Sequence, residues 1–167
     1  DLLFRLAGDS DITERDILEL HRLFYFRIDP DNAGKFRDRN VLITGTDYLP
    51  PAASDVPGVM RDFTAGIYSL RTKLHPVVFA AQLHLKLATI HPFIDGNGRT
   101  ARILMNLALL QAGYPITIIP PVLRGDYIAS LRESNNGSDD MFVHFITCCV
   151  WESQKDYLRL LAGLDRK

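Results

Sequence analysis

Residues 76–112 read PVVFAAQLHLKLATIHPFIDGNGRTARILMNLALLQA. Residues 76–89 and 101–112 are rich in Val, Ala and Leu on nearly all sides, which is typical of helices buried in the centre of a domain. Pro92 disfavours helix at His91, and two glycines flank Asn97, so residues 91–98 are predicted to form a loop. Two core helices joined by a polar loop therefore decide the fold.

Outward from this pair, apolar residues at helical spacing predict four more helices, at about residues 12–26, 55–68, 123–133 and 141–161. Asp11, followed three residues later by Glu14, has the pattern of a capping box at the start of the first of these. Residues 41–49 combine a short β-branched run with a glycine turn, and are predicted to form a small exposed hairpin. We expect one all-α domain over residues 1–167 with a single β-hairpin.

The composition of the chain excludes several classes of protein. With 47% apolar and 23% charged residues, the 167-residue chain can bury a core and is not expected to be disordered. Its 19 Lys and Arg nearly cancel its 20 Asp and Glu, so no nucleic-acid partner is expected. The apolar runs are shorter than the roughly 18 residues of a bilayer span, and a basic, apolar signal peptide is missing from the start, so no membrane partner is expected.

The cysteines indicate the cellular location of the protein, and the first residue indicates whether the chain is a fragment. Cys148 and Cys149 are adjacent in an apolar stretch, where neighbours rarely reach disulfide geometry. We expect two buried thiols, hence a reducing, cytoplasmic location. Because the chain begins at Asp1 rather than Met, we expect a fragment whose upstream segment is missing.

The histidines outside the central loop are expected to be structural or surface residues. His84 and His144 are expected in the core or at its boundary, His21 at the surface, and His75 directly before a proline that starts a helix. No two histidines stand four residues apart with a third ligand nearby, so no zinc site is predicted.

The loop between the two core helices concentrates polar groups where they are expensive for stability, which favours a function for them. Gly96, Asn97 and Gly98 open a helix, so accessible N–H groups at the positive end of its dipole predict an anion-binding site. Arg99 and Arg102 lie three residues apart on one helix face, and their forked donors suit a chain of phosphates.

Two further side chains complete a site for phosphate chemistry. Asp95 is a hard oxygen ligand of the kind that holds Mg²⁺ against substrate phosphates. His91 can accept a proton from an attacking hydroxyl near neutral pH. The loop itself holds no nucleophile, so the hydroxyl is expected from a second substrate such as a side chain of another protein.

The residues from His91 to Arg102 match the pattern HPFx[DE]GNGRxxR in full, and the chain therefore resembles Fic-domain proteins. The resemblance extends to residues 33–37, to the hairpin and to the leucine-rich helices around the loop. It implies a mostly helical fold and the transfer of AMP from ATP to a Ser, Thr or Tyr hydroxyl of a target protein, with pyrophosphate as the leaving group.

The resemblance also implies roles for individual residues. His91 resembles the general base, and Asp95 resembles the ligand of a Mg²⁺ ion that bridges the α- and β-phosphates. By the same resemblance, Asn97 is expected to be a catalytic residue together with His91 and also part of the anion hole. The anion hole and the phosphate clamp comprise Gly96, Asn97, Gly98, Arg99 and Arg102. Phe93 resembles the buried anchor of the loop.

Beyond the loop, the resemblance implies a flap and an adenosine pocket. The hairpin corresponds to a flap that docks the target protein as an added strand, and its docking residues are Val41, Leu42, Ile43, Thr44 and Gly45. Tyr48 either contacts the target or packs the flap. Tyr127 and Asn135 fall where relatives contact the adenosine end of the nucleotide.

Several alternatives remain open at this point. Relatives with a similar motif transfer UMP or phosphocholine or remove AMP from modified proteins, and a non-catalytic nucleotide-binding interaction module is a further possibility. Many relatives carry an inhibitory helix with the pattern [ST]xxxE[GN]; the nearest match runs from Ser10 to Glu14, but Arg15 follows it. We therefore expect an inhibitory helix upstream in the missing segment, or an antitoxin-like partner in trans. A homodimer is also possible.

Overall fold

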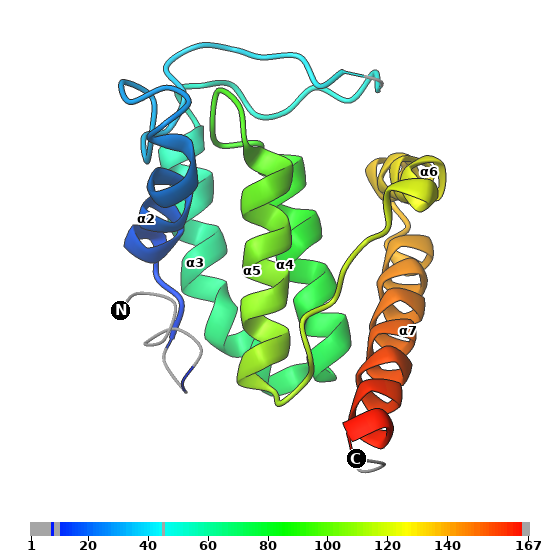
Figure 1. Ribbon diagram of the computed structural model, residues 1–167. Helices are drawn as coiled ribbons and strands as arrows, with labels where there is room; N and C mark the ends of the chain where they lie inside the picture. The colour runs from blue at the N-terminus through cyan, green and yellow to red at the C-terminus, as the bar shows by residue number, and fades with distance from the viewer. Residues whose placement is uncertain (1–7, 9–10, 45, 165–167) are drawn as a thin grey trace.

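The computed structural model describes residues 8, 11–44 and 46–164 (Figure 1). In chain order, the longer helices are α2 (Glu14–Tyr25), α3 (Val56–Lys73), α4 (Pro76–Ile90), α5 (Asn97–Gln111), α6 (Arg124–Asn135) and α7 (Asp140–Leu164). A short 3₁₀ turn, η1 (Pro121–Leu123), precedes α6. The prediction of an all-helical core is confirmed. None of the described helices has the length and apolar character needed to cross a bilayer.

The pair α4 and α5 forms the centre of the molecule, as residues 76–112 predict. The two helices pack against each other, α3 and α7 pack against α4, and α2 packs against α5 (Figure 1). Leu83, Leu87, Leu104 and Met105 are completely buried between them and their neighbours. Pro76 starts α4, and the ring of His75 caps it by accepting a hydrogen bond from the N–H of Val77 at 3.3 Å. The loop 91–96 is therefore held at one end of the most buried helix pair.

Helix α2 begins two residues later than its sequence pattern suggests. Its capping box is made by Thr13 and Asp16, with the N–H of Thr13 donating to Asp16 Oδ2 at 2.9 Å and the N–H of Asp16 donating to Thr13 Oγ1 at 3.3 Å. The later start buries Ile12 just before the cap and Ile17 one turn into the helix. Such an apolar pair across a cap stabilises the entry of the chain, which explains the shift away from Asp11 and Glu14.

The predicted β-hairpin at 41–49 is absent: none of the described residues is assigned to a strand. The segment keeps only a turn, in which the N–H of Thr46 donates to the carbonyl of Ile43 at 3.4 Å. The N–H of Tyr48 donates to Thr46 Oγ1 instead of to a strand, and Pro50 follows without an N–H to donate. The segment arches over one end of the helices (Figure 1).

Tertiary packing also corrects three expectations about single residues. His21 is fully buried rather than at the surface. Cys148 is exposed and only Cys149 is buried, and His144 is exposed rather than in the core. The last two follow from the faces of α7, since Phe142, Ile146 and Val150 form its buried stripe while His144 and Cys148 lie together on the other side. His84 lies in the core as expected.

Candidate active site

His91 stands at the point where α4 stops and the loop begins. Its backbone is left-handed, with φ 52° and ψ 57°, and its N–H closes the helix by donating to the carbonyl of Leu87 at 3.0 Å. The buried side chain of Arg37 fixes this strained turn, because its Nε donates to the carbonyl of His91 at 2.8 Å. The N–H of Arg37 also donates to the carbonyl of Pro92 at 2.9 Å. The position of His91 therefore depends on a residue more than fifty positions earlier.

The ring of His91 is oriented as a general base requires. Its Nδ1 lies 3.2 Å from the carbonyl oxygen of Ala88. Because a carbonyl can only accept, Nδ1 carries the proton and Nε2 keeps a lone pair. Burial, the largest influence, lowers the pKa of His91 below its ordinary value. The imidazole is therefore neutral at pH 7 and able to accept a proton.

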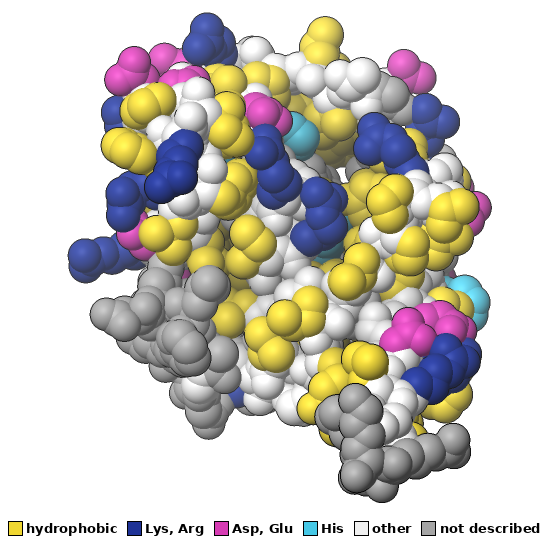
Figure 2. Space-filling view, in the orientation of Figure 1, with side chains coloured by type: hydrophobic (Ala, Val, Ile, Leu, Met, Phe, Trp, Pro, Cys, Tyr) yellow, Lys and Arg dark blue, Asp and Glu magenta, His cyan; other side chains and the backbone are white. Residues whose placement is uncertain are grey.

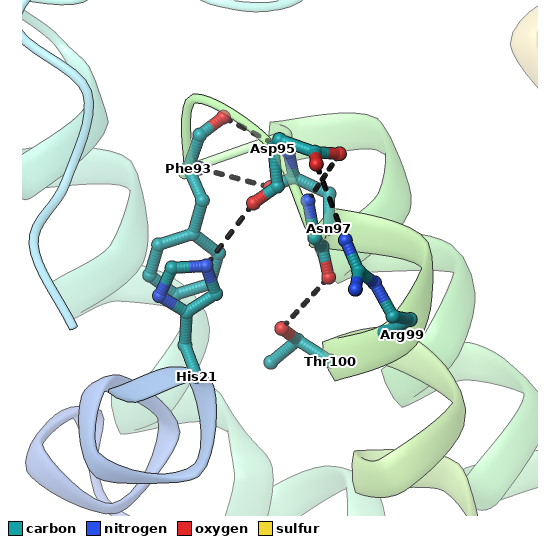
Figure 3. Close-up of polar contacts among 7 residues, drawn as sticks. His21, Phe93, Asp95, Asn97, Arg99 and Thr100 are labelled. Carbon is teal, nitrogen blue, oxygen red and sulfur yellow. Dashed lines mark hydrogen bonds and ion pairs between the residues drawn. The ribbon is translucent and has the colours of Figure 1, made fainter. Parts of the chain in front are cut away.

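The loop is closed by the side chain of Asn97, which is only 2% exposed. Its Oδ1 accepts from the N–H of Phe93, and its Nδ2 donates to the carbonyl of Phe93, both at 2.9 Å (Figure 3). Thr100 adds a second link by donating from Oγ1 to the carbonyl of Gly96 at 3.0 Å. Because this side chain is buried and bonded to Phe93, Asn97 contributes its main-chain N–H to the start of α5.

His21 supports the loop from below (Figure 3). Its ring stacks on Phe93 with a centroid distance of 3.8 Å and an interplanar angle of 2°. Its Nε2 donates to the carbonyl of Asp95 at 3.1 Å, and its Nδ1 accepts from the N–H of Gly34 at 2.9 Å. Burial lowers the pKa of His21, so the neutral ring fits both bonds. His21 thus links α2, the 29–36 turn and the loop 91–96.

Glycine is required at position 96, where α5 begins. Gly96 has φ 81°, and a Cβ there would lie 3.1 Å from His21 Nε2 and 3.2 Å from the ring of Phe24. No side chain caps the helix at this residue. The first N–H groups of α5 are consequently left for a ligand, which is the arrangement of an anion-binding helix start.

Charged groups surround this helix start. Asp95 accepts from the N–H of Gly96 through Oδ1 at 2.6 Å and pairs with Arg99 through Oδ2 at 3.2 Å. The guanidinium of Arg99 lies over the ring of Phe24, 5.1 Å from its centroid. In Figure 2, Lys and Arg side chains gather in the upper part of the face, over the start of α5. Positive charge is therefore concentrated at the start of α5.

A pocket of about 170 Å³ lies beside the loop and brings distant segments together. Among its lining residues are His91 and Gly98 from the loop, Ile43 and Thr44 from the segment above it, and Tyr127 and Asn135 from α6. The hydroxyl of Tyr127 lies 3.3 Å from Nε2 of the buried His84. Burial raises the pKa of Tyr127, and the nearby Arg102 partly offsets this. An apolar pocket thus opens directly next to His91 and the start of α5.

Comparison with known proteins identifies the family. Residues 11–109 match the family model described as Fic/DOC. The chain belongs to the Fic/DOC family. It is 44% identical over 163 residues to the protein adenylyltransferase Fic of Drosophila melanogaster, covering 97% of this chain and 33% of that protein. This Fic domain therefore spans about a third of the length of the curated relatives it matches.

Solved structures show the same architecture. Fic-1 from C. elegans (residues 134–508) superposes with a TM-score of 0.85 at 31% identity, covering 98% of this chain and 50% of that one. A Fic domain containing signaling protein from Bacteroides thetaiotaomicron gives a TM-score of 0.80 at 26% identity, covering 91% of this chain and 65% of that one. The helical core built around residues 76–112 is thus the Fic fold.

The structure brings together many of the site residues that the sequence predicts in this Fic domain. His91, Gly98, Ile43, Thr44, Tyr127 and Asn135 line one pocket. Asp95 and Gly96 directly precede α5, and Arg99 and Arg102 lie in its first two turns. Val41 and Leu42 are not among the pocket residues, Leu42 being 80% exposed, and Gly45 and Ser10 lie outside the described residues.

Two residues that position the loop, His21 and Arg37, are not among the site residues that the sequence predicts. His21 lies four residues after Ile17 and four before Tyr25, so its spacing places it on the buried face of α2 and could have revealed it. Arg37 belongs to the 33–37 stretch that resembles Fic proteins, but nothing local to it indicates its bonds to the carbonyls of His91, Arg39 and Pro51.

Proposed function

We propose that this Fic domain transfers AMP from ATP to a hydroxyl side chain of a protein substrate. The observation that carries the proposal is the neutral His91, held on a fixed turn, beside a pocket and next to an uncapped helix start. The curated relatives that match 97% of the chain are protein adenylyltransferases, which supports AMP as the transferred group.

The proposed reaction uses the groups in a defined order. Nε2 of His91 takes the proton of the substrate hydroxyl, and the oxygen forms a bond to the α-phosphorus of ATP. The bond from that phosphorus to the oxygen bridging the α- and β-phosphates breaks, and pyrophosphate leaves. The N–H groups at the start of α5 and the side chains of Arg99 and Arg102 stabilise the negative charge that develops on the departing phosphates.

Asp95 fits a Mg²⁺ ion bound jointly with substrate phosphates. Its side chain is 64% exposed, and among the described residues it belongs to no cluster of three acidic, His or Cys side chains that could hold a metal alone. When bound, Mg²⁺ would neutralise phosphate charge. The same carboxylate also orients Arg99, since the two side chains are paired.

We place the protein substrate along residues 41–44. This segment forms no strand, so its main-chain groups can pair with an added strand. Ile43 and Thr44 line the pocket that holds His91, which brings a substrate bound there to the base. Tyr127 and Asn135 on the facing helix α6 are proposed to contact the adenosine.

Label transfer tests the proposal directly. The protein is incubated with Mg²⁺, a cell lysate and ATP labelled on the α-phosphate, and we expect labelled proteins. His91→Ala should reduce the rate by about 10²- to 10⁴-fold, the usual contribution of a general base, while ATP affinity changes little. His144→Ala, an exposed histidine on α7, serves as the matched control and should label as the wild type does.

Two results would refute the proposal. One is the absence of α-phosphate label on any protein although ATP binds. The other is label that arises only from ATP carrying the isotope on the γ-phosphate, which would show phosphate transfer instead of AMP transfer.

A further inference from the structure

A second, larger hollow of about 710 Å³ lies between α3 and α4. Its apolar lining comes from Val59, Phe63, Leu70, Leu85 and Ile90. Gly66 on α3 also lines it, and a Cβ placed there would meet no atom within 4 Å. The missing side chain therefore leaves the middle of this groove open.

The groove is adjacent to the pocket that holds His91. Tyr48, Thr89 and Asn135 line both hollows. Tyr48 belongs to the segment on which we place the protein substrate, and Thr89 lies two residues before His91. A polypeptide that presents a hydroxyl to His91 can therefore continue past Tyr48 and Thr89 into the groove.

The size of the groove suits a short extended peptide. Along α4 its lining runs from Gln82 to Ile90. Eight helical steps of about 1.5 Å cover roughly 12 Å, which is the length of about four residues of extended chain.

The charges of the groove argue against a nucleotide. Lys86 is the one cationic side chain among its lining residues, whereas Asp62 and Asp139 carry carboxylates. Asp139 accepts a hydrogen bond from Gln82 Nε2 at 2.9 Å, which holds one carboxylate across the hollow. The lining has no paired arginines like Arg99 and Arg102, and at the one helix start that it includes, before α7, it carries the carboxylate of Asp139. An apolar floor with a slightly acidic rim favours an uncharged or basic peptide.

We infer that this groove binds the segment of the protein substrate next to the modified residue, and that it selects a large apolar side chain within about four residues of the modified hydroxyl. The inference rests on the proposed AMP transfer. It adds a determinant of substrate choice that lies on α3 and α4, outside the motif and outside residues 41–44.

Gly66→Leu tests the inference, because it fills the groove from within a helix. Replacing a glycine in a helix interior does not weaken the helix, so the variant should unfold at the same or a higher urea concentration. Gly58→Leu is the matched control: Gly58 also lies on α3, its Cβ also meets no atom within 4 Å, and it does not line the groove.

The measurement is AMP transfer from α-labelled ATP to lysate proteins, with the modified sites mapped by mass spectrometry. We expect wild type and Gly58→Leu to modify sites enriched in large apolar residues within about four positions. Gly66→Leu should label about tenfold less, the effect of losing one buried apolar side chain, and should lose the enrichment. Its affinity for ATP should stay unchanged.

Three results would overturn the inference: equal labelling by Gly66→Leu and wild type, no apolar enrichment at wild-type sites, or weaker ATP binding by Gly66→Leu, which would make the groove part of the nucleotide site. If the wild type labels nothing while ATP binds, the proposed function itself fails, and the inference fails with it.

Discussion

His21 shows how a single buried residue can organise a site without touching substrate. It stacks on Phe93, donates to the carbonyl of Asp95 and accepts from the N–H of Gly34. These contacts join three segments that are far apart in the chain. The carbonyl that His21 holds belongs to Asp95, directly before Gly96, the N-cap of α5, where we propose that phosphates bind.

We predict that His21→Phe keeps the stacking but loses both hydrogen bonds. Two buried main-chain groups would then lack partners, at a cost of about 1–3 kcal/mol each. Urea unfolding should show a loss of roughly 2–4 kcal/mol, and AMP transfer should fall more than ATP affinity does, because the loop loses its support. Leu23→Ala, at an exposed position of the same helix, is the control and should change little. Unchanged stability in His21→Phe would contradict this role.

At the scale of elements, the start of α5 decides whether the proposed anion site forms. Gly96 is the N-cap, its φ is 81°, and the space beside it is occupied by His21 and Phe24. An alanine there would adopt a strained backbone and press on the ring that holds the loop. The helix start, rather than any one side chain, is therefore the sensitive feature of this element.

We predict that Gly96→Ala lowers AMP transfer by at least about tenfold and weakens ATP binding, because a strained left-handed residue costs about 1–3 kcal/mol and the first N–H groups of α5 shift. Gly113→Ala is a matched control at the other end of the same helix. Gly113 also has φ 81°, but a Cβ there meets no atom within 4 Å. It should lose stability and keep activity, and equal activity losses in both variants would refute the argument.

At the scale of the whole molecule, buried histidines link stability to pH. Burial lowers the pKa values of His21 and His91, and it lowers the pKa of His84 to about 3. When the pH falls below 6.5, the ordinary pKa of histidine, these residues take up protons more readily in the unfolded chain than in the folded one. Their stabilising contribution is therefore full above pH 6.5 and decreases as the pH falls towards the folded values.

We predict a loss of about 2 kcal/mol from His84 alone between pH 6.5 and pH 4.5, since each pKa unit corresponds to about 1.4 kcal/mol and the unfolded residue is already half protonated at pH 6.5. Urea unfolding at these two pH values measures it. His84→Gln should be less stable at neutral pH but should show a smaller change between the two pH values, whereas His144→Gln should behave as the wild type. An equal change in all three proteins would show that His84 does not carry the effect.

The sequence by itself determined the helical core and the presence of a loop between its two central helices, although α5 begins at Asn97, so that the loop ends at residue 96 and not at 98. It also predicted the residues that we propose to bind phosphate. These features depend on residues that are close together in the chain: the apolar character of 76–112, the proline and glycines of the loop, and the spacing of Arg99 and Arg102. Local spacing translates directly into a helix face or a helix start. The predictions of a cap at Asp11 and of a hairpin at 41–49 were wrong, because burial of Ile12 and competing hydrogen bonds decide these features.

Only the tertiary structure decided what surrounds the loop. His21 bonds to Asp95, 74 positions later, and Arg37 bonds to His91, 54 positions later. Residues of α6, which follows the loop in the sequence, line the pocket beside it. The groove between α3 and α4 exists only when those helices are packed. Contacts of this kind depend on which buried surfaces pack against each other in the folded protein, and the local sequence of one segment does not predict that packing.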